Sequence, residues 1–167
     1  MKLLILDYGS GNLQSVYNSI KYVVNDNNLS YEIIVSDKII NVKKSDYIIL
    51  PGVGSFHNCM LSLSHKPGLL DHLNEHALIK KKPFLGICVG MQLIAEYGLE
   101  KQKTFGLGWI KGRVKHLNFN GECTKKNLKI PHIGWNSLNR NVNGKILTKI
   151  NRNDQFYFVH SYFFETI

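Results

Sequence analysis

Short apolar runs alternate with segments of helical spacing over the first hundred residues, and this alternation limits the possible folds most strongly. The runs at 2–8, 31–36, 46–50 and 83–87 have the length and composition of buried strands, and helical spacing marks residues 12–24, 69–79 and 90–97. Strands that alternate with helices form a parallel sheet covered on both faces. Segments 105–117, 129–133 and 155–164 are instead rich in β-forming residues with turns between them, which favours antiparallel additions. We therefore predict one α/β domain over residues 1–167, flavodoxin-like, with a mostly parallel sheet, helices on both faces and a β-rich C-terminal extension.

Composition excludes several classes of protein. The chain has 167 residues, of which 44% are hydrophobic and 20% charged, so a disordered or collagen-like chain is excluded. Its three cysteines form no CxxC pair, and this argues against a disulfide framework or a zinc ribbon. No apolar run reaches the roughly 18 to 20 residues of a membrane span, and the first apolar run ends too early for a signal peptide. We expect a cytoplasmic protein that does not bind a membrane.

The charge balance raises the question of nucleic-acid binding. Lys and Arg number 21 against 12 Asp and Glu, which gives a formal charge of +9. Nucleic-acid binding needs clustered cations, often with exposed aromatic rings between them. Here the basic residues are scattered in sequence, apart from short clusters such as Lys125-Lys126. We therefore expect a solvated basic surface and no nucleic-acid partner.

The strongest chemical signal is Gly86-Ile87-Cys88-Val89-Gly90, an apolar strand that runs into a cysteine and then directly into a helix. This is the cysteine form of the nucleophile elbow. Such a sharp turn holds its nucleophile in strained dihedral angles, and glycines on either side avoid clashes. The thiol would lie at the positive end of the helix dipole, which favours thiolate, and the Val89 amide would face a developing oxyanion. The alternative is a Cys88 buried as a small hydrophobic residue between packing glycines.

The elbow resembles the nucleophile motif of class I (triad) glutamine amidotransferases, which usually carry Leu where this chain has Val89. Five further blocks in matching order are similar to the glutaminase subunits of imidazole glycerol phosphate synthases. These blocks are Asp7-Tyr8-Gly9-Ser10-Gly11-Asn12-Leu13, Leu50-Pro51-Gly52-Val53-Gly54-Ser55-Phe56, Gly106-Leu107-Gly108-Trp109-Ile110, Pro131-His132-Ile133-Gly134-Trp135-Asn136 and Tyr157-Phe158-Val159-His160-Ser161-Tyr162. The resemblance covers essentially the whole chain.

The resemblance implies that glutamine is hydrolysed to glutamate and ammonia through a thioester on Cys88. It also implies that the ammonia passes to a separate β/α-barrel cyclase subunit in a heterodimer of histidine biosynthesis. No metal or other cofactor is expected. The implied oxyanion residues are Gly52, Val53, Gly54 and Val89, and Gln92 would contact the bound glutamine. Candidate contacts with the partner are Asn12, Trp135, Tyr157 and His160.

One part of the family pattern is missing. The family takes its catalytic base from a His-Pro-Glu motif near the C-terminus, and this motif is absent from the sequence, which stops shortly after the block that contains His160. We therefore expect a C-terminally incomplete domain that is nearly inactive alone, because a nucleophile without its base loses most of its rate. His160 could serve as a substitute base, but a structural or interface role is the better interpretation.

Four other interpretations remain open at this stage. His72-Leu73-Asn74-Glu75-His76 fits the HxxEH zinc pattern, although a third ligand is not evident. Gly9-Ser10-Gly11 lacks the third glycine of a dinucleotide-binding loop. The chain could be a paralogue that supplies ammonia to an amidotransferase for surface sugars. It could also be a non-catalytic docking subunit, since the His-Pro-Glu motif is absent.

Overall fold

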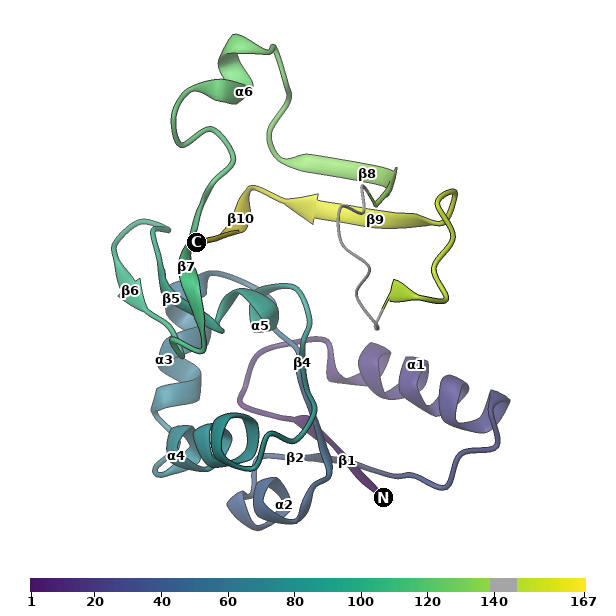
Figure 1. Cartoon of the computed structure of the whole chain (residues 1–167). Helices are drawn as coiled ribbons and strands as arrows, with labels where there is room; N and C mark the ends of the chain where they lie inside the picture. Colours follow the sequence, from purple (N-terminus) through teal and green to yellow (C-terminus); the bar gives the residue numbers. More distant parts are fainter. Residues whose placement is uncertain (139–146) are drawn as a thin grey trace. The chain divides into compact units, whose positions relative to one another are not determined.

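The computed structural model describes residues 1–138 and 147–167 (Figure 1). The chain divides into two compact units. Unit 1 contains Met1–Lys115 and Phe164–Ile167, and unit 2 contains His116–Phe163. Unit 1 is therefore built from two separate stretches of the chain.

A four-stranded parallel sheet forms the centre of unit 1, in the order β2-β1-β3-β4. Its strands are β1 (Lys2–Leu6), β2 (Glu32–Ser36), β3 (Tyr47–Leu50) and β4 (Phe84–Gly86). Leu4 of β1 pairs with Ile34 on one side and Ile48 on the other, and Leu4 is fully buried. The order matches the start of a flavodoxin-like sheet, which confirms the predicted fold class.

Helices cover both faces of this sheet. Their bounds are α1 (Leu13–Asp26), α2 (Ile39–Lys44), α3 (Phe56–Ser64), α4 (Leu69–Asn74) and the π-helical turn η1 (Glu75–Ile79). The chain moves from β1 to β2 in one direction across the sheet and from β2 to β3 in the other. Because such crossovers are right-handed, α1 and α2 lie on opposite faces, and α4 packs beside α2.

The sequence analysis missed α2 and α3, which are only six and nine residues long. Tertiary packing stabilises α3, since Phe56, Cys59, Met60 and Leu63 are all buried. Its N-terminus is capped twice. The Ser55 Oγ accepts a hydrogen bond from the Asn58 N–H at 3.3 Å, and the Glu100 carboxylate accepts one from the Phe56 N–H at 2.8 Å. Glu100 is far away in sequence, so this second cap gives no local signal.

A second sheet corrects the prediction of a helix over 90–97. Its order is β10-β7-β5-β6, from β5 (Ala95–Gly98), β6 (Thr104–Phe105), β7 (Ile110–His116) and β10 (Tyr162–Thr166). The helix α5 covers only Val89–Gln92. It ends there because Tyr97 pairs with Phe105 on one side and Arg113 on the other. The β-rich prediction for 105–117 is confirmed, but β5 and β7 are parallel and not antiparallel as expected.

Unit 2 contains α6 (Glu122–Lys125) and a two-stranded antiparallel sheet of β8 (His132–Ser137) and β9 (Gln155–His160). The register places His132 opposite His160 and Trp135 opposite Tyr157. Antiparallel pairing in this part of the chain agrees with the sequence analysis.

Candidate active site

Cys88 occupies the turn that the sequence predicts for a nucleophile. It lies between β4 and α5, its side chain is exposed, and its backbone has φ +54°. A non-glycine residue in this left-handed region is strained. The Cys88 carbonyl accepts hydrogen bonds from the Met91 and Gln92 N–H groups at 3.0 and 3.2 Å. Local helix formation therefore holds the strained residue in place, while α5 is too short to carry a large dipole.

Close packing explains the two glycines that flank Cys88. A Cβ on Gly86 would lie 2.4 Å from the Met91 Cα, and a Cβ on Gly90 would lie 1.9 Å from the Leu50 carbonyl oxygen. Both distances are far below ordinary van der Waals contact. The glycines therefore let the elbow fold back onto β4 and β3, and the alternative of a cysteine buried between packing glycines fails because Cys88 is exposed.

The Pro51–Gly54 turn lies directly against the elbow. A Cβ on Gly52 would be 2.5 Å from the Gly90 nitrogen and 3.1 Å from the Val89 carbonyl carbon. The Leu50 carbonyl accepts a hydrogen bond from the Ile87 N–H at 2.9 Å. These contacts follow from the parallel pairing of β3 with β4, because both turns leave the same edge of the sheet. The structure therefore brings together the Gly52 and Val89 regions that the sequence analysis placed at the oxyanion.

The Val53 peptide groups are held by Ser10. The Ser10 Oγ donates a hydrogen bond to the Val53 carbonyl at 2.7 Å and accepts one from the Val53 N–H at 3.3 Å. The Cys59 thiol contacts the same carbonyl at 3.3 Å and the Ser10 Oγ at 3.2 Å. The Val53 amide, expected to face an oxyanion, is therefore occupied in this conformation, while Gly54 follows at φ +106°.

Tyr8 lies beside Ser10 and Cys59, and the sequence analysis did not single it out. Its side chain is buried, and its hydroxyl lies in contact with the Ser10 hydroxyl and the Cys59 thiol. Burial raises the pKa of Tyr8 well above its ordinary value, and the Cys59 thiol adds to the increase while Ser10 opposes it. A Cβ on Gly52 would lie 2.9 Å from the Tyr8 hydroxyl. The hydroxyl is therefore a buried donor next to the Pro51–Gly54 turn.

A polar cavity of about 240 Å³ is lined in part by residues that come directly after the Pro51–Gly54 turn in the chain. Its lining residues are Ser55, His57, Asn58, Glu100, Lys101 and Gln102. The His57 Nδ1 lies 3.0 Å from the Thr104 Oγ1 and 3.2 Å from the Gln102 Nε2. The sequence analysis missed this cavity because its two walls are more than 40 residues apart in the chain.

Gln92 and Asn12 each form a hydrogen bond at the end of a helix. Gln92 is half-buried, and it closes α5 through its N–H. The Asn12 Oδ1 accepts a hydrogen bond from the Ser15 N–H at 3.1 Å and so caps α1. This cap gives Asn12 a structural function that does not depend on any partner.

His160 is part of a hydrogen-bonded pair of histidines in unit 2. Its Nδ1 lies 2.9 Å from the Tyr162 carbonyl oxygen and its Nε2 lies 3.0 Å from the His132 Nδ1. A carbonyl only accepts, so the proton must be on the Nδ1 of His160, and His132 must donate to the His160 Nε2. Asn136 then donates to the His132 Nε2 at 2.7 Å. Because the lone pair of His160 is already used, this arrangement supports the structural interpretation of His160 over that of a catalytic base.

Trp135 and Tyr157 form a cross-strand aromatic pair on β8 and β9. Their ring centroids are 5.4 Å apart, and their side chains are 65% and 55% exposed. Ile133 and Val159 form the next pair of the same face and are also exposed. We call these four side chains the hairpin apolar face. Clustered exposed aromatic residues are common anchors of protein interfaces.

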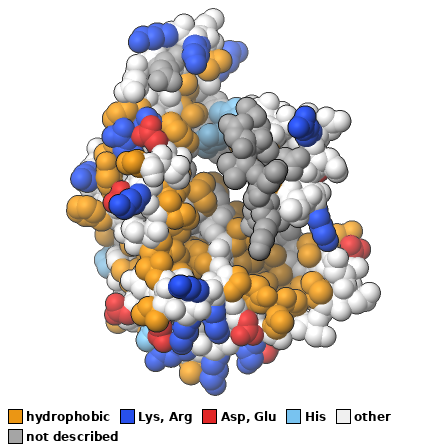
Figure 2. Space-filling view, in the orientation of Figure 1, with side chains coloured by type: hydrophobic (Ala, Val, Ile, Leu, Met, Phe, Trp, Pro, Cys, Tyr) orange, Lys and Arg blue, Asp and Glu red, His pale blue; other side chains and the backbone are white. Residues whose placement is uncertain are grey.

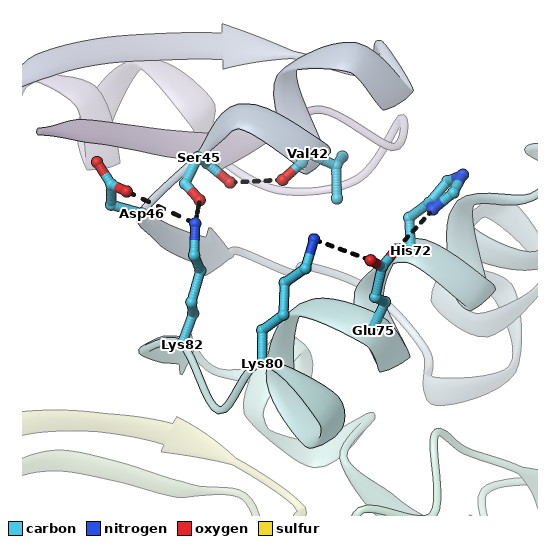
Figure 3. A network of polar contacts seen from close by, with 7 residues as sticks. All are labelled: Val42, Ser45, Asp46, His72, Glu75, Lys80 and Lys82. Carbon is cyan, nitrogen blue, oxygen red and sulfur yellow. Dashed lines mark hydrogen bonds and ion pairs between the residues drawn. The ribbon is translucent and has the colours of Figure 1, made fainter.

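The HxxEH segment does not form a metal site. Glu75 lies between Lys80 and His72, with its oxygens 2.8 Å from the Lys80 Nζ and 3.4 Å from the His72 Nδ1 (Figure 3). His76 is buried, and its Nε2 donates to the Pro83 carbonyl at 3.2 Å. Within residues 1–138 and 147–167, no group of three His, Cys, Asp or Glu side chains could hold a metal ion.

The basic residues are interspersed with acidic ones (Figure 2). Several lysines of unit 1 have acidic partners within 3.5 Å, in the pairs Lys2–Glu32, Lys66–Asp37, Lys80–Glu75 and Lys82–Asp46. Part of the formal +9 charge is therefore neutralised locally, as expected for a solvated surface. Among the described residues, no helix is both long and apolar enough to cross a membrane.

Comparison with known families identifies the family of the chain. The family model described as "Glutamine amidotransferase class-I" matches residues 4–166, almost the whole chain. The chain belongs to the class-I glutamine amidotransferase family. This result confirms the resemblance that the sequence motifs indicate.

Individual relatives of the chain share one protein name. The chain is 43% identical over 164 residues to "Imidazole glycerol phosphate synthase subunit HisH" of Pelagibacter ubique, covering 98% of this chain and 76% of that protein. It is 42% identical over 165 residues to the protein of the same name from Rhodospirillum rubrum, with 98% and 75% covered. A solved structure titled "Crystal structure of glutamine amidotransferase" matches with a TM-score of 0.55 and 13% identity. That match covers 80% of this chain and 62% of the other, so the chain spans less than two thirds of it. At this identity the structural match shows the fold alone.

Proposed function

We propose that this amidotransferase hydrolyses the side-chain amide of glutamine, with Cys88 as the nucleophile. The Cys88 sulfur attacks the amide carbon, ammonia leaves from the tetrahedral intermediate, and a γ-glutamyl thioester remains. Water then attacks the thioester, which releases glutamate and regenerates the thiol. The observation that carries the proposal is an exposed cysteine at φ +54° between a parallel strand and a helix, in a chain of this family.

The oxyanion of the tetrahedral intermediate is proposed to lie between the elbow and the Pro51–Gly54 turn. Preorganised backbone N–H groups stabilise such an oxyanion because they need no reorganisation during the reaction. The Val89 amide would come from the elbow, and the amides of Val53 and Gly54 from the turn. Packing of Gly52 against Gly90 supports this arrangement, since it keeps the two groups of donors together.

The bound glutamine is proposed to contact Gln92 and to place its amino-acid end in the polar cavity. The cavity begins at Ser55, directly after the oxyanion turn, and its volume of about 240 Å³ is sufficient for an amino acid. Glu100 and Lys101 supply one negative and one positive side chain, which match the α-ammonium and α-carboxylate groups of the substrate.

The ammonia is proposed to pass to a β/α-barrel cyclase subunit, for imidazole glycerol phosphate formation in histidine biosynthesis. The names of the relatives from Pelagibacter and Rhodospirillum support this pathway. The hairpin apolar face, with Trp135 and Tyr157, is the proposed contact with the cyclase, together with Asn12 and His160. We further propose that both units belong to one amidotransferase domain, since the family match spans them, and that the protein works in the cytoplasm.

Covalent labelling tests the nucleophile. The chain is treated with 6-diazo-5-oxo-L-norleucine, a glutamine analogue with a diazoketone in place of the amide, and the modified residue is identified by mass spectrometry. We expect modification at Cys88, none at the half-buried Cys123, and no labelling of a Cys88→Ala variant. Modification of Cys123 with Cys88 left free would refute the proposed role of Cys88.

Isothermal titration with the cyclase subunit tests the partner face. We expect Trp135→Ser to weaken binding at least tenfold, as for an aromatic anchor near the centre of an interface. Phe105→Ser, at an aromatic side chain of unit 1 that is 73% exposed, is the matched control and should leave the affinity unchanged. Equal affinities of wild type and Trp135→Ser would exclude the hairpin apolar face from the interface.

A further inference from the structure

His57 lines the polar cavity and has no role in the reaction as proposed above. It lies in the first turn of α3, and its side chain is half-buried. The Thr104 Oγ1 lies 3.0 Å from the His57 Nδ1, and the Gln102 Nε2 lies 3.2 Å from the same nitrogen. These two partners are 47 and 45 positions further along the chain. The ring is therefore held in place by a separate segment that packs against the start of α3.

These contacts assign the donor and the acceptor of the His57 ring. In a neutral imidazole one nitrogen donates and the other accepts, whereas an amide nitrogen only donates. The amide nitrogen of Gln102 makes its shorter contact with the Nδ1, so the Nδ1 accepts and the proton is on the Nε2. The same amide nitrogen lies 3.4 Å from the Nε2 and cannot accept its hydrogen. The Nε2–H is therefore a donor that an oxygen atom of a ligand would satisfy better than Gln102 does.

The position of Glu100 indicates which oxygen this is. The Glu100 carboxylate accepts the Phe56 N–H at 2.8 Å, so it is fixed one residue before His57. An amino acid carries its ammonium and carboxylate groups on one carbon, so a ligand whose ammonium binds Glu100 places its carboxylate close by. Lys101 also lines the cavity, but it is exposed, and flexible solvated charges contribute little. A half-buried ring that is held by two side chains is better preorganised for this contact.

We propose that His57 is a specificity-determining residue, whose Nε2–H donates a hydrogen bond to the α-carboxylate of the substrate while Glu100 binds the α-ammonium group. Gln102 is exposed, and its side chain moves off the Nε2 when the carboxylate binds. A site built to hydrogen-bond one group of a substrate rejects analogues that lack the group. The substrate class is therefore free α-amino acids, and not glutamine within a peptide, where an amide replaces the carboxylate. This inference rests on the proposed function and deepens it.

Three ligands that differ by one group test the contact, with dissociation constants measured by NMR titration of the chain. They are L-glutamine, γ-aminobutyramide, which lacks the α-carboxylate, and glutaramate, which lacks the α-ammonium group. We expect His57→Ala to weaken L-glutamine and glutaramate about tenfold, the value of a hydrogen bond to a charged group, and to leave γ-aminobutyramide unchanged. His57→Gln supplies an amide N–H near the same position and should restore most of the affinity. His65→Ala, at the exposed opposite end of α3, is the matched control and should change nothing.

Glu100→Gln should give the complementary pattern, with weaker binding of L-glutamine and γ-aminobutyramide and unchanged binding of glutaramate. A His57→Ala variant that loses affinity equally for all three ligands would show that the ring only supports the cavity, and one that binds glutaramate as the wild type does would show that it makes no contact with the carboxylate. Either result overturns the inference, and if the diazoketone still labels Cys88, the proposed function stands. If the wild type neither binds L-glutamine nor is labelled, the proposed function fails as well.

Discussion

Substitution of Gly90 by alanine should destabilise unit 1 by about 2 to 4 kcal/mol, the sum of an overpacking cost and a lost hydrogen bond. The new Cβ would lie 1.9 Å from the Leu50 carbonyl oxygen and 2.8 Å from the Leu50 carbonyl carbon. Both neighbours are backbone atoms of a fully buried residue, so no flexible side chain can move aside. Overpacking of a core costs roughly 1 to 3 kcal/mol. The Leu50 carbonyl also accepts the Ile87 N–H at 2.9 Å, and loss of that hydrogen bond adds about 1 kcal/mol.

Urea denaturation, followed by far-UV circular dichroism, measures this change in the free energy of unfolding. Gly108→Ala is the matched control, because Gly108 has φ +68° but nothing within 4 Å of its Cβ position. It should cost only the roughly 1 to 2 kcal/mol of a left-handed alanine. A Gly90→Ala variant as stable as Gly108→Ala would show that the elbow does not pack against β3 as described. The proposed reaction would then lose the contact that keeps its oxyanion donors together.

Three further predictions concern side chains outside the elbow. Burial lowers the pKa of His76 below the ordinary 6.5, so His76 of the unfolded chain takes up a proton at a higher pH than His76 of the folded chain. The free energy of unfolding should therefore fall as the pH drops below about 6.5. Equilibrium unfolding at about pH 7.5 and about pH 5.5 should show this loss in the wild type and not in His76→Gln. Hydrogen bonds from Lys115 and Arg113 hold the pKa of Glu165 below its ordinary 4.5. The stability that these hydrogen bonds contribute should therefore be lost as the pH falls below 4.5. Glu165→Gln should remove this decrease when the free energy of unfolding is measured against pH. Trp109→Phe removes a hydrogen bond of 2.6 Å from the Trp109 Nε1 to the Asn74 Oδ1 but keeps an aromatic ring against Phe84. Urea denaturation should show a decrease of about 1 kcal/mol in the free energy of unfolding. An unchanged midpoint would mean that this hydrogen bond contributes nothing to stability.

Local patterns were sufficient to predict the first sheet and the elbow. The strands β1, β2, β3 and β4 are short apolar runs bounded by turn residues, and a cysteine flanked by glycines directly after such a run is typical of a nucleophile elbow. Sequence periodicity failed for residues 90–97, because pairing of Tyr97 with Arg113 and Phe105 outweighs the helical spacing. Local propensity is a weak guide where such tertiary contacts exist.

Several features that the sequence analysis missed join distant residues. Ser10 reaches Val53 across 43 positions, Glu100 reaches the Phe56 N–H across 44, and His132 reaches His160 across 28. A single sequence gives no register between such segments, so neither the clamp on Val53 nor the pairing of the histidines could be predicted. The exposed aromatic pair Trp135 and Tyr157 was named from the resemblance, but its placement on one face depends on the β8–β9 register.

The division of the chain also has a consequence for engineering. Unit 2 departs from unit 1 at β7 and returns to it at β10, and these strands are neighbours in one sheet, with the Leu117 N–H bonded to the Ser161 carbonyl at 2.8 Å. The two ends of the excursion are therefore already within the span of a tight turn. A miniature protein in which a few glycine and asparagine residues replace that excursion should retain the elbow, and it would separate the chemistry of the thiol from everything that the inserted hairpin contributes.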